Sequence, residues 1–302
     1  MDLPTLQSPS SIDVAIFRRA GIVPLLAKYE APSDAGLDRW MAAHFGGWQS
    51  AEAADAGIFF AIDVDEVLAY ATNFGLIGGW SYCIAASLVE QDARTHVLAL
   101  ARKLARRDVA PFLDRATYAP DSLGCTLCEV LPDGDELPIE VDEPGHTDGS
   151  YRIRPVTSTV PLARSVYDVL LSALRTGHVP DVVSATRLLP VGRQPGLRRS
   201  LPLYGNIVVD LRDDDPVQAL VRLRAGAKGN GDGRLAALCR VALNAMVYGN
   251  FARLDQVRTR SGRRWVLAER HGDYAFPPLA ATVPALTRLL VGLAEYLSSE
   301  VS

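Results

Sequence analysis

The segment from 215 to 251 constrains the fold more than any other, because it predicts two helices separated by a turn. Asp215 and Pro216 mark a helix start, since the carboxylate can cap the helix and proline at the first helical position loses no hydrogen bond. The run GNGDG, residues 229–233, ends this helix. A second helix follows at once, and so short a turn predicts an antiparallel helical hairpin.

Polar residues recur at every fourth position on both predicted helices. Arg224 and Lys228 share a face of the first, and Arg240, Asn244 and Tyr248 share a face of the second. Such a stripe suits a nucleoside triphosphate, because cations hold phosphates and a tyrosine ring can stack under a base. The alternative, two amphipathic helices with solvated side chains, stays open at this point. The apolar line roughly opposite, expected to pack, is Leu235, Leu238, Ala242 and Met246.

Charge is unevenly distributed along the chain. Residues 187–264 contain 15 Lys and Arg against 6 Asp, a net charge of +9, whereas the whole chain carries −4, which leaves −13 on the remainder. A basic segment suggests a phosphate-bearing partner, and the alternative is a solvated charged surface. No apolar run approaches the ~20 residues of a membrane span, and the start lacks the blocks of a signal peptide. We therefore expect a cytoplasmic protein with no membrane partner.

Elsewhere the pattern predicts a mixture of helices and strands. We expect a buried strand at 58–62, and a strand hairpin in 125–141 that turns at Pro-Asp-Gly-Asp. Cys125 and Cys128 supply two of the four ligands of a structural zinc site, and two half-buried thiols near a strand end are favoured over a metal. The stretch 8–26 is expected to form a helix that is capped by Ser10 or Ser11 and stopped by Gly21. Further helices are expected at 37–45, at 95–107, and at 161–177, where Gly177 ends the helix.

The helical pair resembles the fingers of family B DNA polymerases. Arg224-x-x-x-Lys228, a short turn, and Arg240-x-x-x-Asn244-x-x-x-Tyr248-Gly249 are similar to the family's Lys-x-x-x-Asn and Tyr-Gly, and the divergent bacterial branch also places three residues between Asn and Tyr. Further segments resemble that branch in the same order, from residue 8 to residue 297: 8–24, HFGGW at 44–48, 59–80, 131–139, 170–197 and 276–297.

The resemblance implies an α+β fold, with a polymerase-like palm on a mainly antiparallel sheet and an antiparallel helical-hairpin fingers subdomain. It divides the chain into four parts. These are 1–57, an N-terminal helical segment entering the palm; 58–209, a palm-like region with a hairpin insertion; 210–250, the fingers-like hairpin; and 251–302, a palm helix that ends before the last catalytic motif.

The same resemblance implies the chemistry of nucleotidyl transfer. Asp63 matches the family's catalytic, metal-binding aspartate, with Mg²⁺ or Mn²⁺ as the expected cofactor. The implied partners are a DNA primer-template and a deoxynucleoside triphosphate (dNTP). The residues implied to bind the nucleotide are Arg224, Lys228 and Arg240 at the phosphates, and Asn244, Tyr248 and Gly249 at the incoming nucleotide.

Departures from the family pattern leave alternatives open. Glu66, Leu68 and Ala69 stand where Ser, Tyr and Pro are expected, and Arg240 replaces a lysine. The family's Asp-Thr-Asp motif would follow 276–297, so we expect a second polypeptide, or sequence beyond Ser302, to supply it; we also expect no exonuclease domain before residue 60. One alternative is a catalytically inactive, polymerase-derived protein that binds nucleic acid or nucleotides. Another is an α/β protein whose helical hairpin serves only packing.

Overall fold

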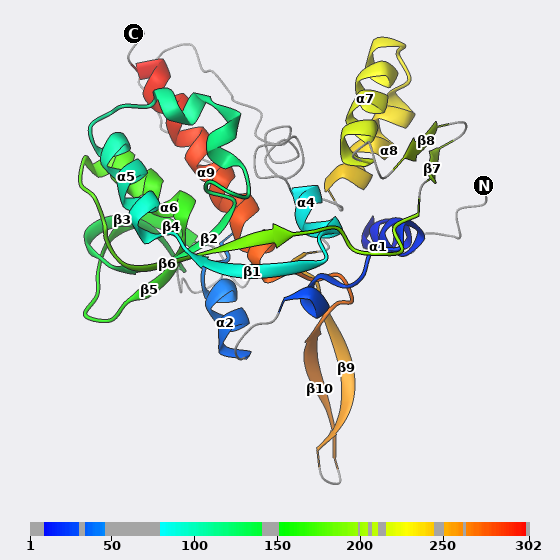
Figure 1. The fold of residues 1–302 in the computed structure, drawn as a ribbon, viewed down its shortest axis with the longest axis horizontal. Helices are drawn as coiled ribbons and strands as arrows, with labels where there is room; N and C mark the ends of the chain where they lie inside the picture. The colour runs from blue at the N-terminus through cyan, green and yellow to red at the C-terminus, as the bar shows by residue number, and fades with distance from the viewer. Residues whose placement is uncertain are drawn as a thin grey trace. The chain divides into compact units, whose positions relative to one another are not determined.

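The computed structural model describes residues 9–29, 34–45, 79–140, 151–198, 200–204, 207–210, 216–244, 251–261 and 264–299. Its fold is mixed α+β with mainly antiparallel sheets (Figure 1). The α-helices are α1 (Pro9–Ala20), α2 (Asp34–Ala42), α4 (Gly79–Ile84), α5 (Arg94–Ala105), α6 (Val166–Thr176), α7 (Pro216–Gly229), α8 (Gly233–Asn244) and α9 (Pro277–Ser299). The strands are β1 (Ser87–Asp92), β2 (Cys125–Leu131), β3 (Asp133–Glu140), β4 (Tyr151–Thr157), β5 (Leu162–Ser165), β6 (Asp181–Val191), β7 (Ser200–Tyr204), β8 (Ile207–Asp210), β9 (Leu254–Ser261) and β10 (Arg264–His271). Short 3₁₀ helices are η1 (Leu25–Lys28), η2 (Ala110–Leu113) and η3 (Arg115–Tyr118).

The chain forms two compact units, each built from segments that are far apart in the sequence. Unit 1 contains Met1–Glu30, Gly78–Val89 and Pro190–Ala280. Unit 2 contains Ala31–Ile77, Glu90–Leu189 and Ala281–Ser302. The four-part division in chain order, derived from the resemblance, stays a prediction.

In unit 1, helix α1 is held by contacts from late in the chain. Phe17 is buried and its ring lies 6.3 Å from that of Phe251 and 5.3 Å from that of Tyr274. Gly21 ends the helix with φ +75°, and a Cβ atom at this position would lie 2.6 Å from the carbonyl oxygen of Gly196. Only glycine therefore fits this helix end without moving the backbone. The helix begins at Pro9, so the predicted caps Ser10 and Ser11 are wrong, because both lie inside it.

The largest sheet, with strand order β1-β6-β2-β5, lies mainly in unit 2. Strand β2 pairs antiparallel with β5 on one edge and with β6 on the other. Its cysteines, Cys125 and Cys128, are both fully buried free thiols, more deeply buried than predicted. Burial is the main reason that the pKa of Cys128 lies well above its usual range. These thiols are core residues of a central strand.

The predicted hairpin between β2 and β3 is wrong, although both strands exist. Only Pro132 separates them, and both edges of β2 are already paired with β5 and β6. Strand β3 instead pairs antiparallel with β4, with a register shift between Asp133 and Asp135. Gly134 lies at that shift with φ +83°, so the Pro-Asp-Gly-Asp sequence forms an irregularity inside the strand in place of a turn.

Helix α6 contacts both strands and a helix of unit 2. It packs on β2 and β3, while α5 packs against it. It begins at Val166 after the cap Ser165 and ends at Gly177, which confirms the predicted stop. The stretch 162–165, predicted as part of this helix, is strand β5.

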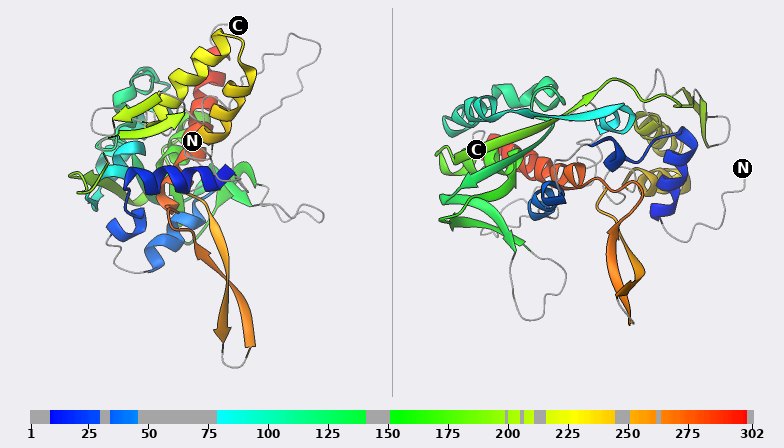
Figure 2. Two further views of the ribbon diagram at one scale, coloured as in Figure 1. Left: turned by 90° about the vertical axis from the view of Figure 1, so that its right-hand side faces the viewer. Right: turned by 60° about the horizontal axis from the view of Figure 1, so that its bottom comes forward.

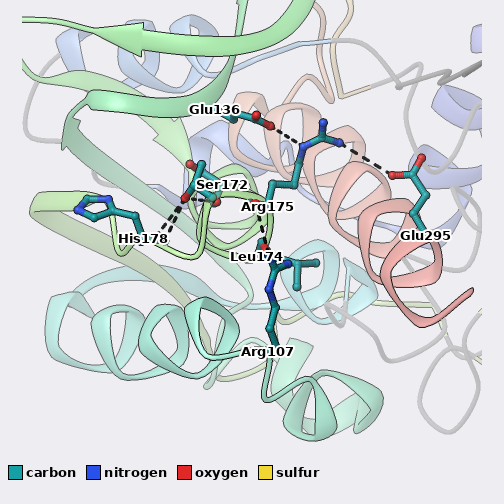
Figure 3. A network of polar contacts seen from close by, with 8 residues as sticks. Arg107, Glu136, Ser172, Leu174, Arg175, His178 and Glu295 are labelled. Carbon is teal, nitrogen blue, oxygen red and sulfur yellow. Dashed lines mark hydrogen bonds and ion pairs between the residues drawn. The ribbon is translucent and has the colours of Figure 1, made fainter. Parts of the chain in front are cut away.

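Figure 3 shows Arg175, near the end of α6, between two carboxylates. Arg175 Nε lies 2.5 Å from Glu136 Oε2, and Arg175 Nη1 lies 3.9 Å from Glu295 Oε2 on α9. Nearby, Arg107 donates a hydrogen bond to the carbonyl of Leu174 (Figure 3).

The other predicted helices exist with shifted ends. The helix predicted at 37–45 is α2, which ends at Ala42, and the one predicted at 95–107 is α5. The stretch 276–297 forms α9, which is buried over most of its length. By length and composition α9 could cross a membrane, contrary to the expectation that no run approaches that length; 89% of its most apolar window is buried, as in the core helix of a globular protein.

Candidate functional site

The predicted helical hairpin is present in unit 1 as α7 and α8, which pack against each other (Figure 1). Helix α7 begins at Pro216, the predicted first helical position. Asp232 accepts a hydrogen bond from the backbone N–H of Leu235 at 3.0 Å and so caps α8. The turn of three residues between the helices explains why they run antiparallel.

Arg224 lies on the packing face of α7. The buried residues Val217, Leu220 and Ala227 follow helical spacing, and Arg224 falls on the same face and is half-buried. Burial raises the pKa of the Cys239 thiol on α8, and the positive charge of Arg224 acts on this pKa in the opposite direction. The guanidinium of Arg224 is therefore close to α8.

Lys228 and Arg240 are the exposed cations of the predicted stripe. Lys228 is one turn after Arg224, near the end of α7, and Arg240 follows the buried Cys239 on α8. Lys228 is one residue from the end of α7 and Arg224 is five residues from it, whereas Arg240 is seven residues from the start of α8. Arg224, Lys228 and Arg240 each make an interaction within the chain. The structure thus places three predicted cations on one hairpin.

The predicted apolar line on α8 is partly wrong. The buried face consists of Ala236, Cys239, Ala242 and Leu243, whereas Leu238 is 44% exposed. Leu235 is half-buried, and Met246 lies outside the described residues. The face that packs is rotated toward Cys239, since α8 must contact both α7 and α1.

Several predicted site residues cannot be placed. Asp63, Tyr248 and Gly249 lie outside the described residues, as does the strand predicted at 58–62, and Asn244 is the last described residue of α8. In the part of the chain that the structure describes, no group of three or more His, Cys, Asp and Glu could hold a metal ion. The role of Asp63 as a ligand of Mg²⁺ or Mn²⁺ stays a prediction.

The hairpin of β9 and β10, also in unit 1, was missed by the sequence analysis. The two strands pair antiparallel, with Trp265 opposite Arg260 and Leu267 opposite Arg258. Directly opposed residues lie on the same face of a sheet, so these four side chains share one face. Trp265 is 71% exposed and Leu267 is 67% exposed, and both arginines are exposed as well. An isolated tryptophan in the arginine-rich stretch RTRSGRRW was the available signal.

A buried ion pair in unit 2 was also missed. Arg288 on α9 donates two hydrogen bonds to the Asp168 carboxylate on α6, at 2.7 and 2.9 Å, and a third to the carbonyl of Phe45 at 3.0 Å. Asp168 and Arg288 are fully buried. Burial alone would lower the pKa of Arg288, but the charge and hydrogen bonds of Asp168 raise it overall. Because Asp168 is already bound twice by one guanidinium, we assign the pair to the core of unit 2.

Comparisons with protein-family models, with curated proteins and with solved structures found no match to this chain.

Proposed function

We propose that this chain is a DNA polymerase-like nucleotidyltransferase fragment that binds a dNTP and primer-template DNA. The observation that carries the proposal is the α7–α8 hairpin, which places Arg224, Lys228 and Arg240 on two packed helices. Cations grouped in this way can neutralise the phosphates of a triphosphate, because charge-assisted hydrogen bonds to phosphate are the strong ones. Asn244, Tyr248 and Gly249 follow on the same chain segment and are assigned to the sugar and base of the nucleotide.

Lys228 and Arg240 are the residues assigned to direct phosphate contact. Both are exposed, whereas Arg224 lies on the packing face and its charge reaches Cys239. Arg224 therefore serves two purposes in this proposal: it fixes the spacing of the helices and adds positive charge behind the exposed pair.

Catalysis requires more than the hairpin supplies. We assign Asp63 to hold Mg²⁺ or Mn²⁺, with a second carboxylate motif contributed by another polypeptide or by sequence beyond Ser302. When bound, such ions activate the primer 3′ hydroxyl and stabilise the pyrophosphate leaving group. If no second motif is supplied, the same hairpin makes the chain a catalytically inactive nucleotide- and nucleic-acid-binding protein.

Titration calorimetry with thymidine triphosphate tests the nucleotide site. We expect Lys228→Ala combined with Arg240→Ala to weaken binding at least about 10-fold, a loss of roughly 1.4 kcal/mol. Arg222→Ala combined with Arg234→Ala is the matched control. It removes two exposed cations from the same helices, each six residues away and hence on another face. Equal losses in both double variants would contradict a specific site.

Primer extension tests catalysis. The chain is assayed with Mg²⁺ or Mn²⁺, alone and with any neighbouring polypeptide that carries Asp-Thr-Asp. Where nucleotide is incorporated, we expect Asp63→Asn to abolish it while leaving triphosphate affinity measurable. Incorporation by Asp63→Asn at the wild-type rate would overturn the assignment of Asp63. Triphosphate binding without extension under every condition would favour the inactive, nucleotide-binding alternative.

A further inference from the structure

We propose that the β9–β10 hairpin is a second binding site, a ribbon that holds single-stranded nucleic acid. In this site Trp265 stacks on an unpaired base, while Arg258 and Arg260 contact phosphates of the same strand. The site lies on a different element from the α7–α8 hairpin and uses different residues, so it goes beyond the proposed function.

The ribbon is exposed along its length and carries large apolar side chains on one face. Figures 1 and 2 show β9 and β10 extending as a narrow two-stranded ribbon beyond the helices α1, α7 and α8 of their own unit. Trp265 is 71% exposed, although tryptophan is usually well buried in proteins. Leu267, two residues further on the same face, is 67% exposed. Large apolar side chains gathered on one exposed face mark an interaction surface.

The arrangement of charge on that face identifies the partner. Arg260 lies directly across from Trp265, and Arg258 lies directly across from Leu267. The described charged side chains on this face are those of Arg258 and Arg260. The hairpin as a whole, 254–271, contains five arginines against Asp255 and Glu269, a net charge of +3. An acceptor for this face must therefore offer both negative charge and flat apolar surface. A nucleic-acid strand offers both, as phosphates and bases in alternation.

The two faces of the ribbon differ in a way that favours one binding side. The opposite face carries Asp255, Val257, Thr259 and Val266, and the register also places the positions of Arg264 and Arg270 there. Val257 and Val266 are only 36% and 42% exposed. It presents no aromatic ring among the described side chains. Stacking requires an accessible aromatic ring on the protein and a base with a free face. Bases in a duplex do not offer a free face, because they already stack on each other. The occupant is therefore a single strand in preference to a duplex.

Fluorescence anisotropy of a 5′-labelled dT20 oligonucleotide, without nucleotide or metal, tests the site. Trp265→Ala should raise the dissociation constant (Kd) about 5- to 150-fold, the effect of losing one stacked base, and Trp265→Phe should restore most of the affinity. Arg258→Ala with Arg260→Ala should reduce the slope of log Kd against log salt by about 1.4, the change expected for two phosphate contacts to a single strand. Val266→Ala, the neighbour on the other face, should bind as the wild type does.

Three results would overturn the proposal. The first is an equal effect of Trp265→Ala and Val266→Ala. The second is a 20-base-pair duplex that displaces dT20 at least as well as unlabelled dT20 does. The third is displacement by polyglutamate at the same charge concentration, which would indicate a surface for acidic proteins. A U20 strand that shows the same dependence on Trp265 would support the site as one for single strands in general.

Failure of the ribbon proposal and failure of the nucleotide proposal give different binding results. If the α7–α8 assignment fails, thymidine triphosphate does not bind, yet dT20 affinity and its dependence on Trp265 remain. If the ribbon proposal fails, Trp265→Ala binds dT20 normally, whatever its affinity for the triphosphate. Since Trp265 and both arginines are exposed, these variants should melt at the wild-type temperature, which circular dichroism can verify.

Discussion

Arg288 is a fully buried cation, and its guanidinium forms an ion pair with the Asp168 carboxylate inside unit 2. Its guanidinium also lies 5.3 Å from the centre of the Tyr151 ring and 6.0 Å from that of Phe45. The charge of Arg288 also affects its surroundings: burial lowers the pKa of His44, and the positive charge of Arg288 lowers it further. Removing Asp168 would therefore leave a buried positive charge without its carboxylate.

We expect Asp168→Asn to lower the free energy of unfolding by about 3–5 kcal/mol, because one partner of a buried pair is left uncompensated. Asp273→Asn is the matched control. It breaks an ion pair of the same length, 2.7 Å to Arg18, in which both side chains are mostly exposed, and it should cost no more than about 1 kcal/mol. Urea denaturation measures both. Similar losses in the two variants would show that burial does not determine the strength of these pairs.

At the level of elements, Gly292 lies where helix α9 contacts helix α6, and a larger residue there would meet a buried leucine. A Cβ atom added to Gly292 on α9 would lie 2.4 Å from Cδ1 of Leu171 on α6, and Leu171 is only 1% exposed. Gly226, inside α7, has open space where a Cβ atom would lie. The two glycines therefore have different reasons for their presence, although both interrupt a helix with the same loss of helix propensity.

Gly292→Ala should lower the free energy of unfolding by about 1–2 kcal/mol, because overpacking outweighs the gain in helix propensity. Gly226→Ala should raise it by up to about 1 kcal/mol, since only the propensity changes. Thermal and urea unfolding of the two variants can be compared directly. A rise in stability for both would show that Leu171 moves aside at little cost.

Local signals explain what could be predicted from the sequence at this scale. The helices α7 and α8 were predicted because Pro216 and the glycine-rich turn act on neighbouring residues. The strands β2 and β3 were found, but the partners of β2 were not, because pairing with β5 and β6 joins segments far apart in the chain. Asp168 and Arg288 lie 120 positions apart, so no local pattern could reveal their contact. The nucleotide site, which stays a prediction, came from the four-residue spacing and from the resemblance, and the ribbon was missed because Trp265 fits neither helical nor apolar periodicity.

Across the whole molecule, the uneven charge of the sequence follows the division into units. Unit 1 contains 18 Lys and Arg against 11 Asp and Glu, a net charge of +7, and unit 2 contains 13 against 24, a net charge of −11. Both candidate sites, the α7–α8 hairpin and the β9–β10 ribbon, belong to unit 1. A local positive potential can attract a polyanion even though the chain as a whole is acidic.

We therefore expect the chain to bind immobilised heparin, a polyanion, at pH 7 despite its net charge of −4. Arg258→Glu combined with Arg260→Glu should lower the salt concentration needed for elution, because phosphate- and sulfate-type contacts weaken as salt rises. Arg102→Glu combined with Arg106→Glu, two exposed residues of unit 2, changes the net charge by the same amount and should elute as the wild type does. If the two double variants elute together, net charge and not its location controls binding, and the basic character of unit 1 has no role in attracting a polyanion.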